Sequence, residues 1–286
     1  EIILRPYQFC NLSEIVVRES DDLASLKRKV RLATILGTLQ STMTDFKYLR
    51  NVWKKNTEEE RLLGVSLTGI MDHPVLSKNV DSKRWLEEMK EEAVKVNKEY
   101  AKKLGIPQSA AITCVKPSGT VSQLVDAASG IHARHHPHYI RTVRGDNKDP
   151  LTQFLIESGV HNERDVMKPD STTVFSFPME SPKGAVTRTE MTAIEQLELW
   201  KTYALHWCEH KPSITVSVKE EEWMEVGAWV YENFDVASGV SFLPFSDHTY
   251  QQAPYQDIEP DDYLEWKHMM SHVEIDWSRL TEFEKE

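Results

Sequence analysis

The sequence predicts an α/β fold, in which short apolar strands alternate with amphipathic helices. Three observations support this. Runs of β-branched and apolar residues have the length of buried strands. Between them, apolar residues recur at helical spacing, and no Pro/Gly/Ser-rich linker divides the chain. Because each crossover helix must cover a face of the sheet, such repeats build parallel sheets or barrels. One α/β domain with an insertion is the simplest organisation.

The first predicted unit is a buried strand at residues 9–17, followed by a long helix that reaches about residue 46. Ser20, Asp21 and Asp22 supply its N-cap, because short polar side chains accept hydrogen bonds from the first free backbone amides. The same reasoning predicts a strand at 62–70, a helix at 81–104 ended by Gly105 and Pro107, a strand at 110–115, and a short helix after residues 117–120.

From residue 130 to about 185 the alternation loosens, and we interpret this segment as an insertion within the domain of residues 1–286. It contains a predicted ribbon at 139–144, a helix at 150–158 and a strand at 172–177. The alternation then returns with a helix at 189–209, a strand at 213–218, a helix at 219–232 and a strand at 239–243.

Composition excludes several classes of protein. The 34 basic and 45 acidic residues give a net charge of −11, which argues against a nucleic acid as the main partner. No apolar run approaches the roughly 18 to 20 residues of a membrane span, and the N-terminus lacks the layout of a secretory signal, so we expect a cytoplasmic protein without a membrane partner. Three widely separated cysteines suggest neither a disulfide framework nor a zinc knuckle.

The clearest candidate for a binding site is Lys-Pro-Ser-Gly-Thr-Val-Ser at residues 116–122. A buried strand ends here, a glycine-containing turn follows, and a helix starts, so backbone N–H groups would converge on one point and could bind an anion. The alternative is a plain β-to-α turn that needs its glycine for a positive φ. It is not a Walker loop, because Lys116 precedes the turn.

Other reactive side chains are weaker candidates by themselves. Cys10 lies on a predicted buried strand, where a thiol is usually inert. Glu1 could be a general base, although a carboxylate at a chain end is more often solvated. Four histidines lie in a proline-containing loop without a carboxylate or thiolate companion, so we predict no metal site at His132, His135, His136 and His138.

Taken together, these segments resemble the catalytic domain of ribonucleotide reductases, specifically the monomeric, cobalamin-dependent branch. The order and spacing of several short segments carry the resemblance, which runs over nearly the whole chain. They are residues 9–15, 61–69, 116–124, 128–132, 139–144 and 239–244.

The resemblance implies an architecture and a set of roles. The chain would supply mainly the second half of a ten-stranded α/β barrel. Glu1 would end an Asn-x-Cys-x-Glu motif whose radical-carrying cysteine lies upstream, and would take the 3′-hydroxyl proton of the ribose. Cys10 would be one of two thiols that reduce C2′ and end as a disulfide, its partner lying further upstream. The substrate phosphates would bind at Pro117, Ser118, Gly119, Thr120, Val121 and Ser122.

The implied cofactor is adenosylcobalamin, and the implied reaction converts ribonucleoside triphosphates into the deoxyribonucleotides used for DNA. A thioredoxin-like reductant and the upstream remainder of the reductase are the implied partners. Diiron-dependent relatives carry a tyrosine pair on a late barrel strand, whereas residues 240–244 here contain no tyrosine. No glycine loop of the glycyl-radical branch is seen near the C-terminus.

Two further expectations follow. Because the radical-carrying cysteine that the resemblance implies is not in this chain, we expect the isolated polypeptide to be inactive. The competing interpretation is a noncatalytic nucleotide-binding or regulatory module, in which Cys10 would point into packed core rather than toward the turn at 117–122. A phosphoryl-transfer enzyme is disfavoured, because Walker and kinase motifs are missing.

Overall fold

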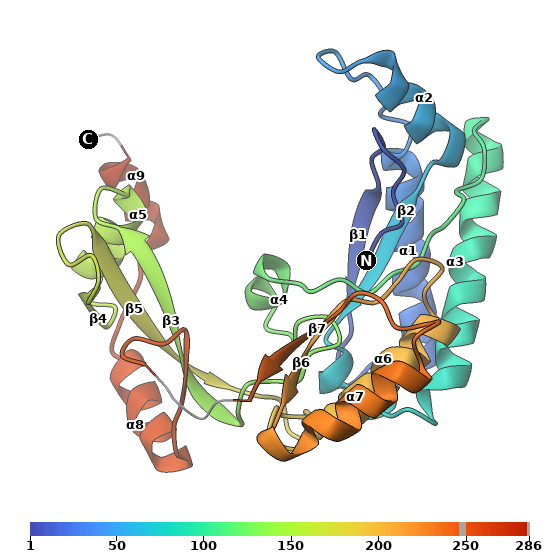
Figure 1. The fold of residues 1–286 in the computed structure, drawn as a ribbon. Coiled ribbons are helices and arrows are strands. Elements are labelled where there is room, and N and C mark those ends of the chain that lie inside the picture. Colours follow the sequence, from blue (N-terminus) through green and yellow to red (C-terminus); the bar gives the residue numbers. More distant parts are fainter. Residues whose placement is uncertain (246–249, 285–286) are drawn as a thin grey trace. The chain divides into compact units, whose positions relative to one another are not determined.

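The structure is a computed structural model that describes residues 1–245 and 250–284 (Figure 1). It divides into two compact units. The first consists of Glu1–Arg134 and Lys183–Phe245, and the second of His135–Pro182 and Ser246–Glu286. Among the described residues, no helix is long and apolar enough to cross a bilayer.

The first unit contains two pairs of parallel strands. β1 (Asn11–Val16) pairs with β2 (Leu63–Thr68), and β6 (Ile214–Val218) pairs with β7 (Val240–Pro244). The segment at 111–115 connects the two pairs through single parallel bridges, Val65 to Thr113 and Val115 to Pro212. The strand predicted at 110–115 is therefore present only as isolated bridges. A ten-stranded barrel is not formed by the described residues, whose sheets have two or four strands.

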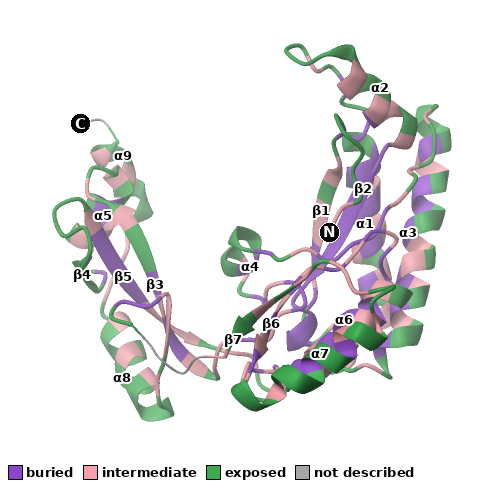
Figure 2. Cartoon of the chain, viewed as in Figure 1, coloured by how far each residue is buried: buried purple, intermediate pink, exposed green. Residues whose placement is uncertain are grey.

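Helices cover these strands. They are α1 (Leu23–Gln40), α3 (Ser82–Leu104), α6 (Ala193–His206) and α7 (Trp223–Glu232). α1 and α6 contact the strands, and α3 and α7 pack against those two helices. All residues of β2 are buried, as the purple strand in Figure 2 shows. The largest fully buried side chains of this core include Trp200, Trp207, Tyr203, Leu26, Leu63, Leu67, Leu86 and Met89. Shorter elements complete the unit: α2 (Asn51–Glu60), η1 (Ile70–Asp72), α4 (Thr120–Leu124) and η2 (Glu220–Glu222).

Local signals explain where the long helices begin and end. The Asp22 side chain accepts the Ser25 amide at 2.7 Å and caps α1, as predicted. α1 stops at Gln40, not near residue 46, because the hydroxyls that follow compete for its last carbonyls: Thr42 Oγ1 donates to Leu39 O at 2.7 Å. α3 ends at Gly105, which adopts the left-handed conformation with φ +67°.

Side chains alternate across each strand, so the face away from the helices has a different composition. On β6, Ile214, Val216 and Val218 enter the core, whereas Thr215 and Ser217 lie on the other face and are only partly buried. On β1, Ile15 faces the core. The other side of the parallel strands is mixed, with polar residues such as Thr215 and Ser217 beside exposed apolar ones such as Leu12 and Leu243.

The second unit is built on an antiparallel sheet with strand order β4-β5-β3-β8. β3 (His138–Asp146) and β5 (Thr172–Glu180) form its centre and contain the ribbon predicted at 139–144 and the strand predicted at 172–177. α5 (Pro150–Glu157) matches the predicted helix at 150–158. The remaining elements are β4 (Asn162–Arg164), β8 (Tyr255–Asp257), α8 (Pro260–Met270), η3 (Trp277–Arg279) and α9 (Leu280–Phe283).

Candidate active site

The turn at 116–122 follows the bridging segment and leads into α4. The amide of Ser118 is already engaged, because it donates to Ser129 Oγ at 2.9 Å. The Ser118 hydroxyl in turn accepts the Ser122 amide at 3.0 Å. An anion at this turn would therefore meet the amides of Gly119, Thr120 and Val121 rather than that of Ser118.

Gly119 decides between the two interpretations of this turn. Its φ is −74°, a value that any residue adopts, so the backbone does not need a glycine there. A Cβ atom at this position would meet nothing within 4 Å. The simple explanation of a turn that needs glycine for a positive φ is therefore wrong. The missing side chain leaves open space in front of the turn, as close approach of a ligand requires.

A cavity of about 380 Å³ lies against this turn. The turn supplies one wall, and β1 and β2 supply the other. The lining residues are Leu12, Ser13, Glu14, Gly64, Ser66, Lys116, Pro117, Ser118, Gly119, Thr120 and Val121.

The Cys10 sulfur lies next to this cavity. A Cβ atom added to Gly64, a lining residue, would stand 3.3 Å from Cys10 Sγ and 2.4 Å from a methyl group of Leu12. The absence of a side chain at Gly64 thus lets the Leu12 side chain and the Cys10 thiol pack against the backbone of β2 at the edge of the cavity. Burial raises the pKa of the Cys10 thiol to about 12, while the positive charge of Lys116 opposes the rise in part.

Glu1 lies near the Lys116 side chain. The Lys116 ammonium is 3.7 Å from Glu1 Oε1, and the Lys116 amide donates to Ser66 Oγ at 2.9 Å. The Glu1 carbonyl accepts the Lys211 amide at 3.0 Å. Lys116 therefore links the carboxylate of Glu1, the environment of Cys10 and the start of the turn.

Sequence reasoning included Lys116 in the candidate segment at 116–122 without giving it a role, and it did not single out Glu14. Glu14 stands four positions after Cys10 within the strand predicted at 9–17, so the alternation of side chains could have placed both on one face. Glu14 Oε1 is buried and has no hydrogen-bond partner within the part of the chain that the structure describes. Lys116 immediately precedes the turn, and that position was the available signal.

The histidines do not meet as one cluster. His132 accepts the Thr215 amide at Nε2 (3.0 Å), and its Nδ1 lies 3.1 Å from Ser129 O. Burial lowers the pKa of His132 below its ordinary value of 6.5. His135, His136 and His138 lie in the second unit. Over residues 1–245 and 250–284, no group of three or more His, Cys, Asp or Glu side chains is arranged to hold a metal ion.

Comparison with known proteins places these features in a class. No family model matches the chain. A crystal structure of a B12-dependent (class II) ribonucleotide reductase superposes with a TM-score of 0.83 at 22% identity, over 99% of this chain and 42% of that one. The fold is therefore that of a class II ribonucleotide reductase.

The sequence relatives are more specific. The adenosylcobalamin-dependent ribonucleoside-triphosphate reductase of Euglena gracilis is 29% identical over 92% of this chain and 36% of its own length. A probable enzyme of the same name from Dictyostelium discoideum is 30% identical over 92% and 35%, respectively. This chain is thus a homologue of adenosylcobalamin-dependent ribonucleoside-triphosphate reductases, which confirms the resemblance seen in the sequence. It spans about a third of the length of these relatives.

Proposed function

We propose that this chain is the C-terminal catalytic part of a reductase that converts ribonucleoside triphosphates into 2′-deoxyribonucleotides. One observation carries the proposal: Cys10 adjoins, through Gly64, the cavity that the turn at 116–121 lines. A noncatalytic nucleotide-binding module would leave the thiol in packed core, away from that turn. The position of Cys10 therefore favours the enzyme.

Cys10 is the reducing thiol in this proposal. Two thiols supply two electrons: the C2′–O bond of the ribose breaks, a C2′–H bond forms, the hydroxyl leaves as water and the thiols become a disulfide. The second thiol lies in the upstream part of the reductase. With a pKa of about 12, the Cys10 thiol keeps its proton at neutral pH until it reacts. A thioredoxin-like dithiol would restore it after each turnover.

Glu1 is the base that takes the 3′-hydroxyl proton. Its carboxylate is paired with the Lys116 ammonium at 3.7 Å. This pair places a positive charge beside the base, on a residue that also lines the cavity at the phosphate turn, and it reduces the repulsion between the carboxylate and bound phosphates. Lys116 thus allows a carboxylate to lie close to a bound triphosphate.

The phosphates bind at residues 117–122, mainly through the amides of Gly119, Thr120 and Val121. Backbone amides carry no formal charge, so they can bind an anion within a chain of net charge −11. The open space above Gly119 lets a phosphate approach the backbone closely. The Ser118 hydroxyl accepts the Ser122 amide and the Ser122 hydroxyl donates to the Ser118 carbonyl, so both hydroxyls shape the turn.

The remaining parts of the site are assigned to the upstream chain. It would contribute the other half of a ten-stranded barrel, to which the parallel strands here add the second half, and the radical cysteine. When bound, adenosylcobalamin would supply the radical that starts the reaction. The thiol and carboxylate beside the cavity match the groups that ribose reduction needs next to such a cofactor, and we assign no described residue to the corrin.

The test is deoxynucleotide formation from a ribonucleoside triphosphate, adenosylcobalamin and a dithiol reductant. The protein should contain this chain joined to the remaining length that its relatives have. We expect Cys10→Ala and Glu1→Gln to abolish turnover, and Cys208→Ala, in the buried core, to retain it. Full turnover by Cys10→Ala would refute the assignment of the reducing thiol. We expect the 286-residue chain by itself to form no deoxynucleotide.

A further inference from the structure

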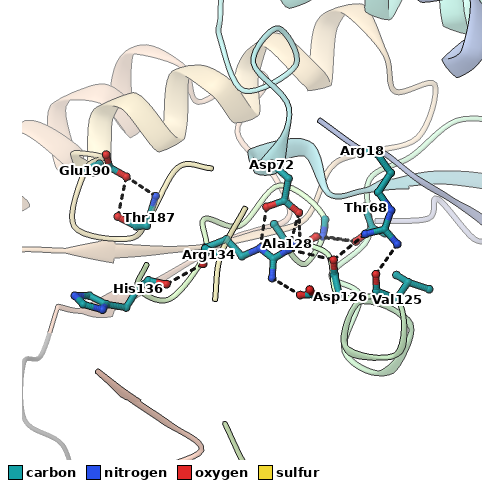
Figure 3. A network of polar contacts seen from close by, with 12 residues as sticks. Arg18, Thr68, Asp72, Val125, Asp126, Ala128, Arg134, His136, Thr187 and Glu190 are labelled. Carbon is teal, nitrogen blue, oxygen red and sulfur yellow. Dashed lines mark hydrogen bonds and ion pairs between the residues drawn. The ribbon is translucent and has the colours of Figure 1, made fainter. Parts of the chain in front are cut away.

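An ion-pair network built around a buried Arg134–Asp72 pair lies in the same unit as the phosphate turn (Figure 3). Arg134 donates to Asp72 through two nitrogens, with Nε to Oδ1 at 2.8 Å and Nη2 to Oδ2 at 2.9 Å. Both side chains are only 4% exposed. Arg134 Nη1 also meets Asp126 Oδ1 at 2.8 Å. Neither Arg134 nor Asp72 lines the cavity.

This network holds the backbone that follows α4. Asp72 Oδ2 accepts the Ala128 amide at 2.8 Å. Thr68 Oγ1, at the end of β2, donates to Ala128 O at 2.9 Å and accepts the Gly130 amide at 2.9 Å. The segment at 126–130 is therefore fixed on β2 by side chains that have few alternative partners in a buried environment.

A second arginine fixes the start of the same segment. Arg18, just after β1, donates to Asp126 O at 2.8 Å and to Val125 O at 2.5 Å. Asp126 has a φ of +47°, a left-handed conformation that costs free energy in a residue other than glycine. Its contacts with Arg18 and Arg134 compensate for this cost, so the conformation depends on the two arginines.

The segment contacts the phosphate turn at two points. Ser129 Oγ accepts the Ser118 amide at 2.9 Å. Gly130 packs so closely that an added Cβ atom would stand 2.5 Å from Lys116 O. These two contacts of the segment at 126–130 thus fix the position of the turn.

We propose that the Asp72–Arg134–Asp126 network is a positioning device for the phosphate-binding turn. Arg134 acts through Ala128, Ser129 and the Ser118 amide, and affinity for phosphate depends on it although it does not line the cavity. This inference rests on the proposed function, because the turn must bind phosphate for its position to matter.

The variants separate positioning from folding. Removing either charge would leave the other buried without compensation, which threatens the fold. Arg134→Lys keeps the charge but loses the two-point contact with Asp72. Ser129→Ala removes only the hydroxyl that connects the segment to the turn. Arg144→Lys is the control, since it alters an ion pair of similar length, 2.7 Å to Asp165, in the second unit.

The experiment is titration calorimetry of the 286-residue chain with tripolyphosphate, CTP and cytidine, well below the melting temperature of each variant. Ser129→Ala and Arg134→Lys should weaken CTP and tripolyphosphate binding about tenfold, the equivalent of one hydrogen bond, and leave cytidine unaffected. Arg144→Lys should bind all three probes as the unaltered chain does. A loss of stability alone would not change the ratio of CTP to cytidine affinity.

Hydrogen exchange of residues 116–124 gives a readout that needs no ligand. We expect these residues to exchange faster in Ser129→Ala and Arg134→Lys than in the unaltered chain. In Arg144→Lys their exchange rate should be unchanged. If the unaltered chain binds CTP and both variants bind it equally well, the inference is wrong and the proposed function stands. If the unaltered chain binds neither CTP nor tripolyphosphate, the proposed phosphate site is wrong. Unchanged exchange at 116–124 would then overturn the positioning role as well.

Discussion

The thiol of Cys10 should react far more slowly than an ordinary cysteine. Burial raises its pKa from 9.0 to about 12, so about a thousandfold less thiolate is present at neutral pH. A thiolate of higher pKa is also a better nucleophile, with a Brønsted coefficient of about 0.4 to 0.5. Each Cys10 thiolate should therefore react about 16 to 32 times faster than an ordinary thiolate. The net expectation is a reaction roughly 30 to 60 times slower than that of an unperturbed cysteine.

The assay is reaction of the 286-residue chain with an aromatic disulfide between pH 7 and 10.5, with the labelled cysteine identified by peptide mass spectrometry. An ordinary thiol stops gaining reactivity above its pKa of about 9, whereas Cys10 should still gain about tenfold per pH unit at pH 10. Lys116→Met should slow the reaction further at every pH, because its charge lowers the pKa of this thiol. Lys95→Met, exposed on α3, is the matched control.

A plateau in Cys10 reactivity near pH 9 would show that the thiol is not desolvated as the structure indicates. Equal rates in Lys116→Met and Lys95→Met would refute the placement of the Lys116 ammonium beside the thiol. The two outcomes are independent, since the first tests burial and the second tests one charge.

Three further changes test the turn and the residues that support it. Gly119→Ala should leave the melting temperature unchanged, because the added Cβ atom meets no other protein atom, and it should weaken tripolyphosphate binding, because that atom takes the space of the ligand. Undiminished binding would argue against the phosphate site. Gly130→Ala should destabilise the chain by about 3 kcal/mol in urea unfolding, against about 1 kcal/mol for Gly159→Ala, because both have positive φ but only the first meets a backbone carbonyl. The folded-state pKa of His132 lies below its unfolded value, so neutral His132 stabilises the fold above pH 6.5 and this contribution is lost as the pH falls. Unfolding free energies at pH 7.5 and 5.5 should therefore differ less in His132→Gln than in the unaltered chain, and an equal difference would exclude the acceptor role toward Thr215.

Local signals in the sequence were enough for most elements of the fold. These signals act within a few residues, so they can be recognised without the structure. They include the cap at Asp22, the left-handed Gly105 and the helical spacing of apolar residues. The sequence placed the end of α1 too late, near residue 46. Hydroxyl groups after Gln40 donate to the last helix carbonyls, and the spacing of apolar residues does not reveal this competition. The strand predicted at 110–115 is present only as single bridges, since its pairing depends on distant partners, β2 on one side and Pro212, just before β6, on the other.

By itself, the sequence determined the order of strands and helices and, through the short segments shared with a known family, the class of reductases that the chain resembles. Tertiary structure alone decided that Lys116 stands beside Glu1, that the Ser118 amide is already bonded, and that Arg134 meets Asp72. The physical reason is distance along the chain. Helix caps and side-chain periodicity are set by neighbours, whereas Asp72 and Arg134 are 62 residues apart, and only the packing of β2 against the segment after α4 brings them together.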